Sequence, residues 1–167
     1  MRRREFILLL GGASKSYAMT GWRLGWLIAP PAAAPLAVKL QEPIVSCAPT
    51  PSQVAAEAAL AGTQTVVEDG RRLFERRRDL FLDVLGPSGA IAARPRGAFY
   101  GLVDIPSGAE NALAFAKRLL IERGVAVVPG DTFGAATARM VRLALTTDDL
   151  SLRKGLEHFR DALAGAA

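Results

Sequence analysis

Lys15 and Arg23 are the two residues whose types and spacing most directly suggest chemistry. Lys15 lies on a turn of mostly small residues at Ala13–Tyr17, and Arg23 follows eight positions later. A lysine amine that is held and partly desolvated can condense with an aldehyde, and the planar guanidinium of arginine can bind two phosphate oxygens at once. The pair indicates a site for an aldehyde cofactor that carries a phosphate. On these two residues alone, solvated cations flanking a strand are the commoner explanation.

The composition excludes several classes of function. The chain has 167 residues, half of them apolar, and a net charge of +5, which suits one ordinary domain or one lobe of a larger enzyme. The cluster Arg76–Arg78 is flanked by Glu75 and Asp79 in a helical pattern, which is typical of a solvated helix face. We therefore expect no nucleic-acid partner. The chain has one histidine, His158, no cluster has metal-ligand spacing, and we expect no metal site.

The compartment is indicated by the cysteine count and by the start of the chain. A single cysteine, Cys47, excludes an internal disulfide framework and suits a reducing compartment; in its apolar setting we expect it to be a small buried residue. The basic residues 2–4 followed by the apolar run Phe6–Leu10 imitate a signal peptide. That run is short for a signal peptide and far too short for a membrane span. We expect a cytoplasmic protein without a membrane partner.

The first half of the chain reads as two strands followed by helix. Phe6–Leu10 is a continuous apolar run, which predicts a strand buried on both faces as in parallel sheets. Trp22–Ala29 predicts a second strand. Residues 53–85 have a helical pattern with breaks at Gly62 and Gly70, and Ser52 is placed to cap its start.

The second half reads as a compact α+β lobe over residues 86–167. A helix is expected at Glu110–Arg123, with Leu113, Ala116 and Leu120 on one face and Gly124 as its end signal. Asp148 or Asp149 is expected to cap a final helix, with Leu152, Leu156, Phe159 and Leu163 on its buried face. Strands are predicted at residues 91–94, 98–105, 125–128 and 140–145. Because two strands near the N-terminus cannot bury their own faces, the chain reads as the last piece of one domain followed by a complete smaller one.

Four segments resemble one family of enzymes. The run Ser14–Gly25, Ser-Lys-Ser-Tyr-Ala-Met-Thr-Gly-Trp-Arg-Leu-Gly, is similar to the lysine signature of class I/II aminotransferases, the aspartate-aminotransferase-like enzymes of pyridoxal phosphate (PLP) fold type I. This motif is long and specific. The similarity continues through Pro95–Tyr100, Gly124–Gly134 and Val141–Leu145, and it extends over essentially all of residues 7–163.

The resemblance implies an architecture. The fold class would be α/β, the C-terminal part of a type I PLP enzyme. Residues 1–50 would be the C-terminal remnant of the large PLP-binding domain, residues 51–85 a connecting helix, and residues 86–167 the small α+β domain. The resemblance also implies a homodimer.

The resemblance further implies a reaction and roles for three residues. The reaction would be amino-group transfer from an amino acid to a 2-oxo acid, with PLP as cofactor. Lys15 would form the internal aldimine and then shuttle a proton between the substrate Cα and the C4′ carbon of the cofactor. Arg23 would bind the cofactor phosphate, and Arg142 would pair with the substrate α-carboxylate. Phe99 and Phe133 would either line the pocket or pack in the core.

The chain departs from the family pattern in two ways, and these leave alternatives open. Gly12 stands where many relatives carry a hydroxyl residue. The family's other cofactor residues lie upstream of the lysine, and none can be placed in residues 1–14. The chain is therefore expected to be a fragment with little activity alone, or one part of an enzyme whose N-terminal half is a separate chain. A non-catalytic, dimerising remnant and another PLP reaction, such as β-elimination or carbon–sulfur cleavage, are the alternatives.

Overall fold

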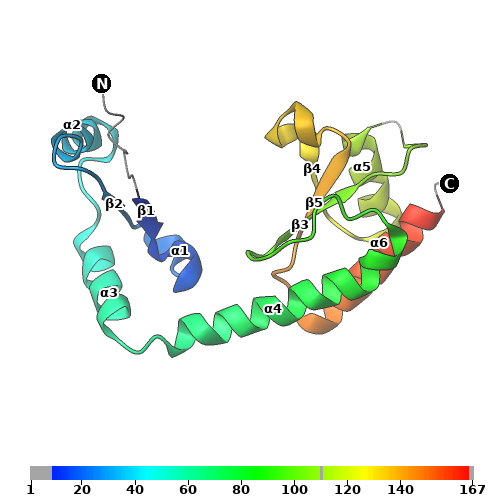
Figure 1. The fold of residues 1–167 in the computed structure, drawn as a ribbon, viewed down its shortest axis with the longest axis horizontal. Coiled ribbons are helices and arrows are strands. Elements are labelled where there is room, and N and C mark those ends of the chain that lie inside the picture. The colour runs from blue at the N-terminus through cyan, green and yellow to red at the C-terminus, as the bar shows by residue number, and fades with distance from the viewer. Residues whose placement is uncertain (1–8, 110, 166–167) are drawn as a thin grey trace, which may run out of the picture. The chain divides into compact units, whose positions relative to one another are not determined.

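The structure, a computed structural model, describes residues 9–109 and 111–165, with the backbone alone at residues 9 and 10. It divides into two compact units, one up to Gly70 and one from Arg71 onward. The boundary falls within the long helix α4 (Thr65–Leu85). Figure 1 labels the elements of each unit. The three-part division at residues 50 and 85 stays a prediction.

In the first unit, two short strands form a hairpin-like pair. Strand β1 (Leu9–Gly12) runs antiparallel to β2 (Gly25–Ile28), with Gly12 opposite Gly25. The strands run in opposite directions because the segment between them folds back through helix α1 (Ala13–Ser16) and a 3₁₀ turn at Thr20–Trp22. This pair is antiparallel, and the prediction that Phe6–Leu10 is buried on both faces as in parallel sheets stays a prediction. Residues 6–8 of the predicted strand lie outside the described residues.

Three helices complete the first unit and lead into the second. They are α2 (Ala34–Val45), α3 (Thr50–Ala61) and the start of α4. Pro49 is the N-cap of α3, so Ser52 lies inside the helix, where it is buried, and is not the cap. The predicted break at Gly62 is confirmed, but α4 continues through Gly70 without interruption. Cys47, expected to be buried, is exposed in the link between α2 and α3.

The second unit contains a three-stranded antiparallel sheet. Its strand order is β3 (Tyr100–Asp104), β5 (Met140–Ala144) and β4 (Val128–Pro129). Side chains alternate along β3 and β5, so that Gly101, Val103, Val141 and Leu143 are buried on one face. The predicted strand at residues 91–94 is reduced to one isolated bridge between Ile91 and Val103.

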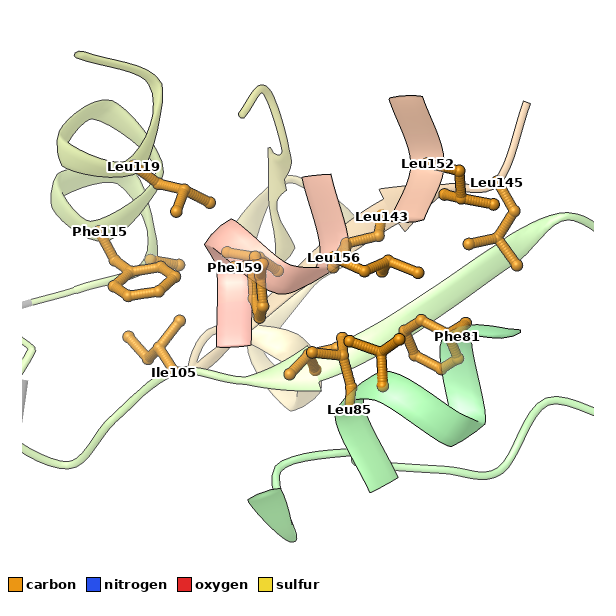
Figure 2. Packing of buried hydrophobic residues seen from close by; sticks show 14 of the residues in the cluster. Phe81, Leu85, Ile105, Phe115, Leu119, Leu143, Leu145, Leu152, Leu156 and Phe159 are labelled. Atoms are coloured by element: carbon orange, nitrogen blue, oxygen red, sulfur yellow. The ribbon is translucent and has the colours of Figure 1, made fainter. Parts of the chain in front are cut away.

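Helices α4, α5 (Ala112–Arg123) and α6 (Asp149–Ala164) pack into one core with this sheet. Figure 2 shows how side chains from the three helices meet those of the sheet. Phe81, Leu85, Phe115, Leu119, Leu156 and Phe159 are each at most 2% exposed. Gly101 makes the approach of α4 possible, since a Cβ there would come within 2.5 Å of the Phe81 ring.

The two predicted helices of this unit are confirmed, and their ends follow from local chemistry. The Asn111 side chain accepts a hydrogen bond from the Ala114 N–H and begins α5, and Gly124 ends it at φ 67°. Asp148 accepts from the Ser151 N–H at 2.9 Å and begins α6, and this bond holds the pKa of Asp148 below its ordinary value. Among the described residues, no helix is both long and apolar enough to cross a bilayer.

Candidate functional site

Lys15 lies on a single helical turn directly after β1. Ala13, at the start of α1, is 1% exposed, whereas the Lys15 side chain is exposed. The Tyr17 N–H donates to the Ala13 carbonyl at 3.2 Å, and the Ala18 N–H donates to the Lys15 carbonyl at 3.3 Å. Ala18 then takes the left-handed conformation, with φ 54°, which reverses the chain after the lysine. The small residues around Lys15 make this tight turn possible.

Two hydrogen bonds connect Arg23 to the Lys15 turn. The Thr20 Oγ1 donates to the Ser14 carbonyl at 3.1 Å, and the Arg23 Nη1 donates to the Thr20 carbonyl at the same distance. Thr20 therefore links the arginine to the residue before the lysine. The structure thus brings the predicted cofactor residues Lys15 and Arg23 into one hydrogen-bonded segment, both with exposed side chains.

The Lys15 turn is anchored on α3 by contacts that the sequence did not reveal. Ala13 and Met19 are buried against Ala56. The Tyr17 hydroxyl donates to the Gln64 Oε1 at 2.7 Å, and the Gln64 Nε2 donates to the Gly62 carbonyl at 3.0 Å, among the carbonyls at the end of α3. Tyr17 and Gln64 are 47 residues apart. No local pattern pairs a tyrosine with a glutamine at that separation, so the contact had no signal in the sequence.

Arg142 belongs to the second unit, in the middle of β5. Val141 and Leu143 point into the core, so Arg142 lies on the opposite face of the sheet. Its Cζ is 4.2 Å from the centroid of the Tyr100 ring and 4.5 Å from that of Phe133. The Arg142 Nε is buried and has no hydrogen-bond partner in the part of the chain that the structure describes. The guanidinium is therefore held by aromatic rings and retains a donor for an external acceptor.

Phe99 and Phe133, expected either to line a pocket or to pack in the core, differ in position. Phe133 is 51% exposed and contacts Arg142. Phe99 is half-buried, and its ring lies 5.4 Å from Phe74 on α4 and 4.5 Å from Tyr100. Tyr100 was missed as a site residue. Strand alternation is the sequence pattern that bears on its position. On paired antiparallel strands, a residue and the residue two positions away from its direct partner are diagonal neighbours on one face.

The turn that carries Phe133 begins at Gly130, where the backbone is tightly enclosed. The Thr137 Oγ1 donates to the Gly130 carbonyl at 2.6 Å, and the Thr132 Oγ1 donates to the Pro129 carbonyl at 2.7 Å. A Cβ on Gly130 would collide with the carbonyl oxygens of Thr137 and Met140. These are backbone atoms, which cannot rotate away, so the turn requires glycine at this position.

We expect Gly130→Ala and Gly155→Ala to change stability in opposite directions. Gly130→Ala should lower the free energy of unfolding by about 1–3 kcal/mol, the usual cost of overpacking. Gly155 lies inside α6, and a methyl group there would meet no neighbouring element within 4 Å, so Gly155→Ala should raise it by about 1 kcal/mol through helix propensity. Urea denaturation followed by circular dichroism measures both. Equal effects of the two substitutions would contradict the enclosure of Gly130.

The chemistry available at these positions is cationic. Lys15 offers an amine and Arg23 and Arg142 offer guanidinium groups, which suit an aldehyde, a phosphate and a carboxylate. Within the described ranges, no group of three or more His, Cys, Asp or Glu side chains could hold a metal ion. His158 lies elsewhere, with its Nδ1 3.1 Å from the Arg123 carbonyl.

Comparisons with known proteins identify the family of the chain. The family model "Aminotransferase class I and II" matches residues 1–159. An aspartate/prephenate aminotransferase of Thermus thermophilus is 39% identical over 165 residues, which are 97% of this chain and 42% of that protein. An arginine–pyruvate transaminase of Pseudomonas aeruginosa is 38% identical over 146 residues, which are 87% of this chain and 37% of that protein.

Solved structures show the same relationship. An aromatic aminotransferase from Pyrococcus horikoshii superposes with a TM-score of 0.87 at 35% identity, covering 95% of this chain and 43% of that one. A double mutant of Thermus thermophilus aspartate aminotransferase gives a TM-score of 0.85 at 40% identity, covering 93% and 41%. The chain thus spans about 40% of the length of the curated relatives it matches. The predicted fold class, an α/β portion of a type I PLP enzyme, is confirmed, and the chain belongs to the class I and II aminotransferase family.

Proposed function

We propose that this chain provides the lysine and two arginines of a PLP-dependent aminotransferase, which transfers an amino group from an amino acid to a 2-oxo acid. The observation that carries the proposal is the segment Ser14–Arg23. There, the lysine turn and the arginine are joined by hydrogen bonds through Thr20. Membership of the aminotransferase family supports the same reaction.

The residues present fit the cofactor. Lys15 is the amine for its aldehyde, and Arg23 is the guanidinium for its phosphate. The Arg23 Nη1 donates a hydrogen bond to the Thr20 carbonyl, and this bond orients the side chain. The other N–H groups of the guanidinium can donate to phosphate oxygens. When bound, PLP supplies an electron sink for the substrate Cα. Lys15 would then hold and move the proton that is removed from the substrate Cα.

Arg142 is proposed to bind the α-carboxylate of both substrates. Its buried Nε has no hydrogen-bond partner among the described residues. A buried donor without an acceptor lowers the stability of the fold unless a ligand accepts its hydrogen bond. A carboxylate accepts from Nε and from a terminal nitrogen in parallel. This contact would hold the substrate and orient its Cα–H bond for proton removal.

The first unit has apolar surface that a larger assembly would cover. All of β2 is exposed, and on α2 Leu36, Leu40 and Ile44 are each at least 60% exposed. A hollow of about 580 Å³ between β2 and α3 is lined by residues that include Trp26 and Leu60. We propose that a polypeptide equivalent to the other part of the relatives covers this surface, as a separate N-terminal half, and that the assembled enzyme is a homodimer.

Complementation tests the function. The chain is mixed with the N-terminal portion of the Thermus thermophilus relative that it does not match, together with PLP, an amino acid and a 2-oxo acid. We expect a new amino acid and a new 2-oxo acid with the complement, and little turnover by the chain alone. Ammonia release would indicate a lyase instead. A complemented, dimeric assembly that takes up no PLP would support a non-catalytic remnant and contradict the proposal.

A further inference from the structure

We propose that Tyr100 and Phe133 are positioning residues that fix the plane of the Arg142 guanidinium and thereby set its affinity for carboxylates. We refer to these two residues as the aromatic pair. The inference deepens the proposed function and rests on it, because the ligand is the α-carboxylate already assigned to Arg142. The pair acts through Arg142 and takes no part in the chemical step.

The sheet register explains why one ring lies next to the guanidinium. Tyr100 pairs with Ala144 and Leu102 pairs with Arg142, so Tyr100 is the diagonal neighbour of Arg142 on the face away from the core. The ring centroid lies 4.2 Å from the Arg142 Cζ, within the range of a cation–π contact. The Tyr100 ring, which belongs to the neighbouring strand, therefore restricts the orientation of the Arg142 guanidinium.

The second ring arrives from a different element. Phe133 ends the 3₁₀ turn Gly130–Phe133, and its centroid lies 4.5 Å from the same Cζ. The turn is held by the hydrogen bond from Thr137 to the Gly130 carbonyl and by the enclosed backbone of Gly130. The backbone that carries Phe133 is thus held by contacts of its own turn.

Tyr100 also has support that is independent of Arg142. Its ring lies 4.5 Å from Phe99, and Phe99 lies 5.4 Å from Phe74 of helix α4. This row of rings connects Tyr100 to the helix that carries the core residues Phe81 and Leu85. The Tyr100 ring and the backbone that carries Phe133 are therefore held by contacts that do not involve a ligand, which favours preorganised binding.

Holding a guanidinium by rings differs from holding it by hydrogen bonds. An arginine fixed by carboxylates or carbonyls uses its N–H groups for that purpose, as Arg139 does with the carbonyls of Ala109 and Pro106. Arg142 is fixed at its π face, and its buried Nε has no hydrogen-bond partner within the described residues. Its donors stay in one plane, available for a planar acceptor with two oxygens. Carboxylates fit this arrangement, whereas spherical anions such as chloride do not.

Arginine side-chain NMR on the full chain tests the inference without requiring turnover. The ¹⁵Nε–¹Hε signal of Arg142 is followed during titration with sodium acetate, and sodium chloride at equal ionic strength is the control. In the wild-type chain we expect an upfield-shifted Hε, caused by the two ring currents, and a response to acetate that chloride does not produce. Tyr100→Leu and Phe133→Leu should each reduce the upfield shift and weaken acetate binding about fivefold.

Conservative variants separate positioning from packing. Tyr100→Phe and Phe133→Tyr keep the rings, so we expect both to retain the upfield shift and the wild-type affinity for acetate. The backbone amide signals of Val141 and Leu143 report whether each variant keeps the sheet. A wild-type Arg142 signal without ring-current shift would overturn the inference even if the leucine variants fail to fold.

The same titration distinguishes failure of the carboxylate role of Arg142 from failure of the role of the aromatic pair. If wild-type Arg142 shows the ring-current shift but responds to acetate no more than to chloride, the carboxylate role itself is wrong, and the proposal for the aromatic pair falls with it. If the wild-type chain binds acetate and folded leucine variants bind it equally well, only the role of the aromatic pair is overturned.

Discussion

Replacing Lys15 by alanine is expected to abolish covalent capture of PLP at the site. An aldehyde needs an unprotonated amine to condense with, and alanine removes the only side-chain amine of the Ser14–Arg23 segment. The helical turn should persist, because its buried contacts come from Ala13 and Met19 and not from the lysine. Borohydride reduction in the presence of limiting PLP, followed by peptide mass spectrometry, measures the capture. We expect the label on the Lys15 peptide in the wild-type chain and none there in Lys15→Ala.

Lys39→Ala is the matched control, since Lys39 is an exposed lysine on α2 in the same unit. It should leave the label at Lys15 unchanged. Arg23→Ala provides a second comparison, because loss of the phosphate partner should lower labelling at Lys15 while leaving the amine in place. Equal labelling of Lys15, Lys39, Lys117 and Lys154 in the wild-type chain would show that Lys15 has no special affinity for the cofactor.

Much of the local structure could be predicted because its causes are local. Asp148 and Gly124 set helix ends through bonds and backbone angles that involve residues within a few positions. The break at Gly62 follows in the same way. Lys15, Arg23 and Arg142 were also proposed from the sequence, because the motif that contains each of them is contiguous.

The prediction of the buried face of α5 failed because two faces of this helix carry apolar residues. In α5, Leu113 and Leu120 were expected on the same face as Ala116, yet Leu113 is 47% and Leu120 is 52% exposed. The helix buries Phe115 and Leu119 instead. Both sets of residues are apolar and have helical spacing, so the period alone cannot choose between the faces. The choice depends on the elements packed against α5, and the Phe115 ring meets Phe159 of α6 at a centroid distance of 5.8 Å.

The contacts that complete the candidate site depend on tertiary structure and could not be predicted. Gln64 meets Tyr17 across 47 residues, and it does so because α3 returns past the Lys15 turn. Tyr100 meets Arg142 only when β3 and β5 pair in the observed register, since a shift of one residue would place the two side chains on opposite faces. A contiguous motif therefore points to candidate site residues, whereas the residues that contact them come from the packing of distant elements.

Arg142→Ala is expected to weaken substrate binding in the complemented enzyme by about 10- to 100-fold, since a hydrogen bond to a charged group contributes about 1.5–3 kcal/mol. The effect should appear mainly as a higher KM, because the carboxylate contact exists before and during the reaction. Arg142→Lys should recover part of the affinity, as lysine restores the charge but not the planar pair of donors. Steady-state kinetics with an amino acid and with its 2-oxo acid measure both variants.

The control for this prediction is Arg153→Ala, which removes the same charge from an exposed position on α6. It should change neither KM nor kcat/KM, so that a general loss of positive charge can be separated from loss of the carboxylate partner. An Arg142→Ala enzyme with unchanged kcat/KM would show that the carboxylate binds elsewhere. The buried Nε of Arg142 would then need another acceptor, because an unpaired donor in the interior lowers stability without serving binding.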